Sequence, residues 1–220
     1  MKPGKIILSF DLDNTLINNR KGIVDSFNYA LQQFNLPLMN RDDIEIMIGI
    51  PLHQMFSTIN KKYVEELVVS FREYYRIKGI YQGYLISGCK DKLQELKNAG
   101  FIMGVITSKK QELAEKMVEI LKIRNYFDYV LGETDDRKEL GKLDPSLKLF
   151  FQTNYPKHHI IVIGDHPKDV MLSNNLRCPF IGVLTGNHSA QELTELKKGK
   201  HLILNSVKEI DQNKIYKLLQ

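Results

Sequence analysis

Two acidic residues stand where the first apolar segment of the chain ends. Asp11 and Asp13 occur in the pattern Asp-Leu-Asp-Asn-Thr, directly after the apolar residues 5–10. In an extended segment residues i and i+2 point the same way, so both carboxylates can face one site. The alternative is a turn, since turns favour Asp and Asn. The pattern alone is moderately specific, because it recurs by chance in about one chain of this length in forty.

A second acidic pair opens a predicted helix. Asp165 follows Gly164, which permits a tight turn after the apolar residues 160–163. Asp169 comes one helical turn later and faces back toward the loop. Capping explains the pair equally well, because carboxylates stabilise the N-terminus of a helix.

Two further candidates lie between the acidic pairs. Thr107 and Ser108 follow an apolar segment that ends at Ile106 and precede a helical pattern, where hydroxyls and free N–H groups bind phosphate. Taken alone, a helix-capping role is favoured for them. Lys142 precedes the helix that begins at Pro145 and could place its ammonium over a phosphate. A lone lysine is more often a surface charge.

These residues need a scaffold that brings strand ends together. Short apolar segments predict six strands, at 5–10, 101–106, 129–131, 160–163, 180–183 and 201–204. Helical patterns alternate with them, at 90–99, 110–121, 145–155, 167–176, 190–197 and 207–219. This alternation predicts an α/β fold with a parallel, Rossmann-like sheet and right-handed crossovers. Open sheets of this kind bind ligands at the carboxyl edge, where the acids would lie.

The connection after the first strand is too long for a simple crossover. About 90 residues separate the first two predicted strands, whereas a complete strand–helix–strand unit needs only about 30, and compact domains rarely contain long structureless loops. Amphipathic helical patterns occupy the interval, at 22–34, 41–48, 52–59 and 61–77. We therefore expect a core domain formed by residues 1–16 and 87–220, and a helical cap domain at 17–86.

Composition excludes several classes of protein. Of the 220 residues, 43% are hydrophobic and 26% charged, as is typical of soluble globular proteins. The formal charge of +5 is mild, and lysine pairs such as 61–62, 109–110 and 197–198 are interpreted as solvated helix faces. No basic block is interleaved with aromatic residues, so no nucleic-acid partner is expected.

The chain also has few features of exported or membrane proteins. Its two cysteines cannot build a disulfide framework, which favours a reducing compartment. No apolar run approaches the ~18 residues of a membrane span, and the first apolar run is too short for a secretory leader. We expect a cytoplasmic protein without a membrane partner. No His-Glu-x-x-His or Cys/His cluster is present, so zinc is not expected.

In combination the candidates are far more specific than any one of them. Their order along the chain, acid pair, hydroxyls, lysine and acid pair, resembles the haloacid dehalogenase superfamily of phosphohydrolases, over the whole chain. The inserted helical segment resembles the cap of its phosphoglycolate-phosphatase-like members. The stretch Gly49-Ile50-Pro51-Leu52 is similar to one found in such caps.

The resemblance implies roles for the residues that carry it. Asp11 would be the nucleophile and form an aspartyl-phosphate, and Asp13 would act as general acid and then as general base. Thr107 and the Ser108 backbone would hold phosphoryl oxygens, while Lys142 would neutralise charge on phosphate and nucleophile.

A bound Mg²⁺ is implied as well. Asp11, the carbonyl of Asp13 and Asp165 would hold the ion, and Asp169 would orient that site. Mg²⁺ prefers hard oxygen ligands and keeps several waters, so a few carboxylates suffice.

The implied function is Mg²⁺-dependent hydrolysis of a small phosphorylated metabolite, with phosphoglycolate as the first choice of substrate, by a monomer or homodimer. The alternatives are a phosphosugar mutase resembling β-phosphoglucomutase, a nucleotidase or pyrophosphatase, and a binding protein without catalysis. His53 lies in the expected cap and is interpreted as a surface or packing histidine.

Overall fold

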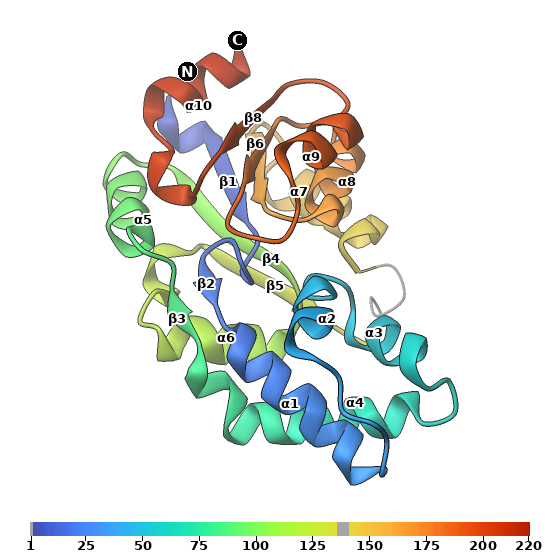
Figure 1. Ribbon diagram of the computed structural model, residues 1–220. Helices are drawn as coiled ribbons and strands as arrows, with labels where there is room; N and C mark the ends of the chain where they lie inside the picture. Colours follow the sequence, from blue (N-terminus) through green and yellow to red (C-terminus); the bar gives the residue numbers. More distant parts are fainter. Residues whose placement is uncertain (1, 136–140) are drawn as a thin grey trace.

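A six-stranded parallel sheet forms the centre of the computed structural model, which describes residues 2–135 and 141–220 (Figure 1). The strand order is β5-β4-β1-β6-β7-β8, and all five neighbouring pairs are parallel. The strands are β1 (Ile6–Phe10), β4 (Ile102–Lys110), β5 (Tyr129–Glu133), β6 (His159–Gly164), β7 (Phe180–Val183) and β8 (His201–Leu204). Each of the six segments predicted from the sequence is therefore a strand.

The central strand β1 is covered on both faces. All five of its residues are at most 1% exposed. Its alternate side chains belong to two different hydrophobic clusters, Leu8 to one and Ile7 to the other. A strand buried on both faces is apolar on both sides, which is why its sequence shows no alternation, and its one polar residue, Ser9, has the Tyr129 hydroxyl as its partner.

Helices pack on both faces of the sheet (Figure 1). One face is covered by α5 (Cys89–Asn98), α6 (Gln111–Ile120) and α10 (Gln212–Leu219). The other is covered by α7 (Pro145–Asn154), α8 (Pro167–Asn175) and α9 (Ala190–Leu196). Among the helices of residues 2–135 and 141–220, none combines the length and apolar composition that a bilayer span requires.

Three predicted boundaries differ from the structure by three residues or more. Strand β4 continues to Lys110, because its polar end still pairs with Glu133 of β5 after a register shift. Helix α4 begins at Val64 instead of residue 61, because Asn60 accepts a hydrogen bond from the Lys62 amide and makes a local turn. The predicted helix 207–219 is broken: a 3₁₀ turn covers 207–209, and Asp211 caps α10.

The lysine pairs are not all solvated. Lys109 lies on β4 with its side chain 7% exposed, and it belongs to the site described below. Lys197 is also buried, and its ammonium donates to Asn174 Oδ1 and to the Cys178 carbonyl at 3.1 and 3.0 Å. Hydrogen-bond acceptors inside the protein replace water around both cations. Cys89 and Cys178 are buried free thiols.

The chain leaves and rejoins the core through two short antiparallel strands. In β2 (Ile17–Asn18) and β3 (Tyr84–Leu85), Ile17 pairs with Leu85. Between them lie α1 (Arg20–Gln33), α2 (Arg41–Ile46), α3 (Leu52–Ile59), α4 (Val64–Ile77) and the 3₁₀ helix η2 (Gly79–Gln82). We call residues 17–86 the cap segment, and its status as a separate domain remains a prediction.

Close backbone contact and aromatic packing hold the cap segment together. The rings of Phe27 and Phe56 stack at 4.3 Å between centroids. Gly22 of α1 lies so near Gly79 that a Cβ added to it would come within 2.2 Å of the Gly79 carbonyl oxygen. A Cβ on Gly79 would in turn meet the ring of Tyr75 at 2.7 Å. These contacts fix the end of α4 against α1.

Replacing Gly22 by Ala tests this contact. In an ordinary helix interior the change stabilises by about 1 kcal/mol. Here we expect net destabilisation of roughly 1–3 kcal/mol, because backbone atoms must move apart. Thermal unfolding should show a lower Tm for Gly22→Ala, while Gln32→Ala, at an exposed position of the same helix, should leave Tm nearly unchanged. A raised Tm for Gly22→Ala would contradict the close packing.

Candidate active site

The four motifs meet at the carboxyl edge of the sheet. From β1 the chain moves outward to β4 and β5, then returns to β6 on the other side of β1. The ends of β1, β4 and β6 are thus neighbours at the point where the strand order reverses, which is where open α/β sheets form a crevice. Asp11 follows β1 and Asp165 follows β6, as the sequence predicts, whereas Thr107, expected just after its strand, lies within β4.

The Asp-Leu-Asp-Asn-Thr turn presents its two acids to one cavity. Asn14 adopts a left-handed conformation with φ of 61°, and its amide donates to the Ile17 carbonyl at 2.8 Å. Leu12 is fully buried in the core, while Asp11 and Asp13 both line the cavity. The hydroxyl of Thr15 donates to Asp165 Oδ1 at 2.7 Å and so connects the two acidic motifs.

Lys142 is a buried cation at the centre of the acids. It lies on a 3₁₀ turn (Gly141–Leu143), is 4% exposed, and its ammonium donates to Asp11 Oδ1 and to Asp169 Oδ1, the latter at 2.5 Å. Burial alone would lower the pKa of Lys142, but the two carboxylates outweigh it and hold the pKa above its ordinary value. The surface-charge interpretation is therefore wrong for this residue.

One lysine does not balance the carboxylates around it. Oxygen atoms of Asp11, Asp165 and Asp169 lie within 4.8 Å of one another, and all three residues are buried. Burial, with Asp169 and Asp13 adding to it, raises the pKa of Asp11 to about 7 even though Lys142 opposes the shift. Burial likewise raises the pKa of Asp165 well above its ordinary value.

This donor set suits a small divalent cation. Mg²⁺ takes carboxylate oxygens and would supply the positive charge that the cluster lacks. Asp165 is enclosed tightly, because a Cβ on Gly186 would lie 1.9 Å from its Oδ2. Both oxygens of Asp169 already accept hydrogen bonds, from Lys142 and from the His166 amide at 3.2 Å. Asp169 therefore fits an orienting role better than a ligand role.

One of the residues that cap the N-terminus of α8, Asp169, also belongs to the acidic cluster of the candidate site. His166 is the N-cap, and its Nδ1 accepts from the Lys168 amide at 3.1 Å while Asp169 accepts from the His166 amide. Gly164 makes room for this arrangement, because a Cβ there would lie 2.3 Å from Asp169 Cγ. The two interpretations of this acidic pair are thus compatible.

Thr107 and Ser108 lie on the same cavity as the first acidic pair. They do not cap a helix, because α6 begins at Gln111 after the end of β4. Thr107 Oγ1 accepts from the Lys109 amide at 3.2 Å, and Ser108 Oγ donates to the carbonyl of Gly49 at 3.3 Å.

The Gly-Ile-Pro-Leu stretch of the cap segment packs directly on the core site. Gly49 has a φ of 110°, and a Cβ there would meet the His166 ring at 2.6 Å. His53 lies nearby on α3 and pairs with Glu65 of α4 at 3.0 Å, so it packs between two helices of the cap segment.

Sequence analysis missed several charged residues at the boundary between core and cap segment. Lys109 Nζ lies 3.2 Å from Asp13 Oδ2, and Arg72 of α4 pairs with Glu133 of β5 at 2.8 Å. Lys109 directly follows Thr107 and Ser108 in the sequence, and this position could have marked it as a residue of the site. Nothing in the pattern of α4 marks Arg72, because its partner is distant in sequence.

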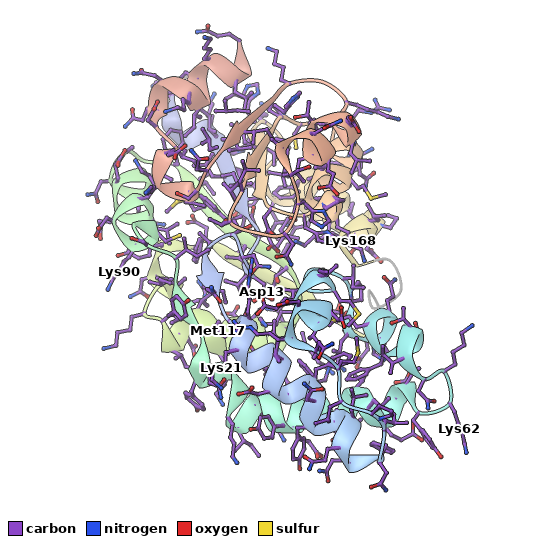
Figure 2. The ribbon with its side chains drawn as sticks, in the orientation of Figure 1. Asp13, Lys21, Lys62, Lys90, Met117 and Lys168 are labelled. Atoms are coloured by element: carbon purple, nitrogen blue, oxygen red, sulfur yellow. The ribbon has the colours of Figure 1, made fainter. Side chains whose placement is uncertain are left out.

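The cavity itself has two different walls. Its empty volume is about 670 Å³, part of which is open to solvent. Figure 2 shows Asp13 between the sheet and the helices of the cap segment. The core contributes the polar residues named above, whereas most of the cap lining is apolar: Ile23, Ile48, Ile50, Leu52, Met55 and Phe71. The reacting group of a ligand would lie on the core side.

Curated proteins similar to this chain include a protein named as a kinase and one named as a pyrophosphatase. A tyrosine-protein kinase, PtkA of Mycobacterium tuberculosis, is 28% identical over 165 residues, which are 74% of this chain and 57% of that protein. This chain thus matches little more than half the length of that relative. A pyrophosphatase, PpaX of Bacillus cereus, is 28% identical over 169 residues, 76% of this chain and 77% of that protein.

Solved structures show the same fold over nearly the whole chain. A predicted phosphatase from Clostridium acetobutylicum superimposes with a TM-score of 0.84 at 27% identity, covering 97% of this chain and 99% of the other. A predicted phosphoglycolate phosphatase from Haemophilus somnus gives 0.80 at 23% identity, covering 97% of each chain. The family model described as haloacid dehalogenase-like hydrolase matches residues 7–183. The chain therefore belongs to the haloacid dehalogenase-like hydrolases.

Proposed function

We propose that the protein is a cytoplasmic, Mg²⁺-dependent phosphomonoesterase that hydrolyses a small phosphorylated metabolite through an aspartyl-phosphate. The observation that carries the proposal is the placement of Asp11 against the buried Lys142, with Asp13, Thr107 and Ser108 on the cavity that Asp11 also lines. A nucleophile, a proton carrier and groups for phosphoryl oxygens are thus together at one edge of the sheet.

In the first step a carboxylate oxygen of Asp11 attacks phosphorus, and the bond between phosphorus and the ester oxygen breaks. Carboxylates are competent nucleophiles for covalent phosphoryl transfer. Asp13 gives a proton to the departing oxygen, which leaves as an alcohol. The hydroxyl of Thr107, the backbone of Ser108 and the ammonium of Lys142 meet the negative charge spread over the other phosphoryl oxygens.

In the second step water attacks the phosphorus of the aspartyl-phosphate. Asp13, now a carboxylate, takes a proton from that water, and the bond between phosphorus and Asp11 breaks to release inorganic phosphate. Asp11, Asp165 and the Asp13 carbonyl would hold Mg²⁺, with Asp169 orienting the site. When bound, the ion neutralises repulsion between the acids and an anionic substrate.

Pyrophosphate is a second candidate substrate. The similarity to the pyrophosphatase PpaX favours it, and the cations Arg72 and Lys110 on the cavity could accept a second phosphate group. Phosphoglycolate is the substrate that the sequence suggests first. One of the similar solved structures, at 23% identity, is that of a predicted phosphoglycolate phosphatase. The reaction at Asp11 is the same for both substrates.

Replacing Asp11 by Asn removes the nucleophile. We expect turnover to fall by more than about a thousandfold, as for other enzymes that lose a nucleophile. The measurement is phosphate release, with and without Mg²⁺, from a panel of phosphoglycolate, pyrophosphate, nucleoside monophosphates and sugar phosphates. Asp25→Asn, on the surface of α1, serves as the matched control and should keep wild-type rates. Undiminished activity of Asp11→Asn would refute the proposal.

The raised pKa of Asp11 makes stability depend on pH and metal. The pKa of Asp11 in the folded protein, about 7, lies above the ordinary value of 3.8. The contribution of this group to the free energy of unfolding is therefore fully present below pH 3.8 and is lost as pH rises through 7. Metal-free protein should therefore melt at a lower temperature at pH 8 than at pH 6, by a few degrees, given about 2–4 °C per kcal/mol.

Added Mg²⁺ should restore the Tm at pH 8, because it binds the ionised carboxylates of the folded state. Asp11→Asn should show a shallower decline with pH and a smaller response to Mg²⁺. Melting curves recorded at both pH values test this without any assay of activity. Identical pH and Mg²⁺ responses of wild type and Asp11→Asn would count against the metal assignment.

A further inference from the structure

Lys109 is a second buried lysine at the site, and the reaction steps above give it no role. It lies on β4, two residues beyond Thr107, and its side chain is 7% exposed. Its ammonium is 3.2 Å from Asp13 Oδ2. A buried ammonium needs partners at a defined place, and Asp13 supplies one of them.

The two oxygens of the Asp13 carboxylate have different surroundings. Oδ2 is paired with Lys109, whereas Oδ1 is buried and accepts no hydrogen bond from the described residues. An unsatisfied buried polar atom costs about 1–3 kcal/mol, and such atoms in native proteins call for an explanation. Asp13 lines the cavity, so the pairing at Oδ2 fixes its carboxyl there and leaves the other oxygen without a partner among the described residues.

The cap segment holds Lys109 in place. The hydroxyl of Tyr75, on α4, accepts from Lys109 Nζ at 3.1 Å and from Asn19 Nδ2 at 2.9 Å. The ammonium also lies 4.6 Å from the centre of the Tyr75 ring. Tyr75 is 1% exposed and is stacked on Phe71. Lys109 therefore contacts Asp13 of the core and Tyr75 of the cap segment at once.

We propose that Lys109 is a positioning residue for Asp13, and that Tyr75 fixes Lys109 so that the Asp13 carboxyl is oriented toward the departing oxygen only while Tyr75 of α4 contacts Lys109 of β4. This inference rests on the proposed phosphatase reaction. It links the position of the cap segment to the orientation of the proton donor, with Lys109 acting through Asp13 and not on the substrate.

Two phosphate esters that differ in their leaving group reveal such a role. p-Nitrophenolate departs readily without a proton, whereas glycerol departs poorly unless the acid protonates it. Neither p-nitrophenyl phosphate nor glycerol 2-phosphate carries a second anionic group, so a binding role of Lys109 toward such a group would affect neither. The ratio of their kcat/KM values covers the steps up to leaving-group departure and isolates the proton transfer.

The variants are Lys109→Met, Lys109→Arg and Tyr75→Phe. Lys116→Met is the matched control, because Lys116 also joins core to cap segment, donating to the Arg76 carbonyl at 3.2 Å and lying 5.3 Å from the centre of the Tyr81 ring. Melting temperatures verify that each variant is folded. Phosphoglycolate is assayed beside the two esters as a substrate with a second anionic group.

We expect Lys109→Met to lower kcat/KM for glycerol 2-phosphate by about 10- to 100-fold, within the range of acid catalysis, and that for p-nitrophenyl phosphate by less than about threefold. Tyr75→Phe should also lower kcat/KM for glycerol 2-phosphate more than that for p-nitrophenyl phosphate, but by a smaller factor. Lys109→Arg should keep most of the wild-type kcat/KM for glycerol 2-phosphate. Lys116→Met should leave the ratio unchanged.

Other outcomes would overturn the inference. Equal losses on both esters would mean a structural role, and a rise in KM confined to phosphoglycolate would make Lys109 a substrate-binding residue. An altered ratio in Lys116→Met would mean that any contact with the cap segment has this effect. Failure of the phosphatase proposal would look different, because wild-type protein would then release no phosphate that depends on Asp11.

Discussion

The contact of Lys142 with Asp11 and Asp169 is the constraint on which this structure depends. Buried carboxylates are costly unless a positive charge lies beside them, and the sheet places acids after both β1 and β6. Lys142 offsets part of that repulsion, and a divalent cation would offset the rest. The dense core around β1 can therefore surround a charged site. Gly164 and Gly186, which have no side chain, let the backbone lie close to Asp169 and Asp165.

The core and the cap segment contribute different chemistry to the cavity. Asp11, Asp165, the hydroxyls and Lys109 come from the ends of strands, where the backbone is fixed by neighbouring strands. Apolar side chains such as Ile50 and Phe71 come from the cap segment. Reacting groups built on a rigid sheet keep their geometry, while the apolar residues of the cap segment that only line the cavity can vary without disturbing it. This division explains why phosphoryl chemistry is easier to infer here than the identity of the substrate.

The sequence predicts the fold well because the sheet is buried on both faces and its strands are continuous apolar segments. It places Asp11 and Asp165 at one edge of the sheet because they directly follow β1 and β6. The polar end of β4 escapes prediction, since Lys110 is in a strand only through pairing with Glu133 of β5. Lys109 and Lys142 resemble surface lysines in sequence, because the acids that pair with them, Asp13 and Asp11, lie far away along the chain.

The contact between Ser108 and Gly49 has a consequence for ligand entry. The Ser108 hydroxyl donates its hydrogen to a carbonyl of the cap segment, whereas the phosphoryl oxygens are assigned to the Ser108 backbone. The side chain and the backbone of this residue thus serve different partners. A phosphate held by the backbone leaves the contact between Ser108 and Gly49 in place, so ligand entry does not require this part of the cap segment to leave the core.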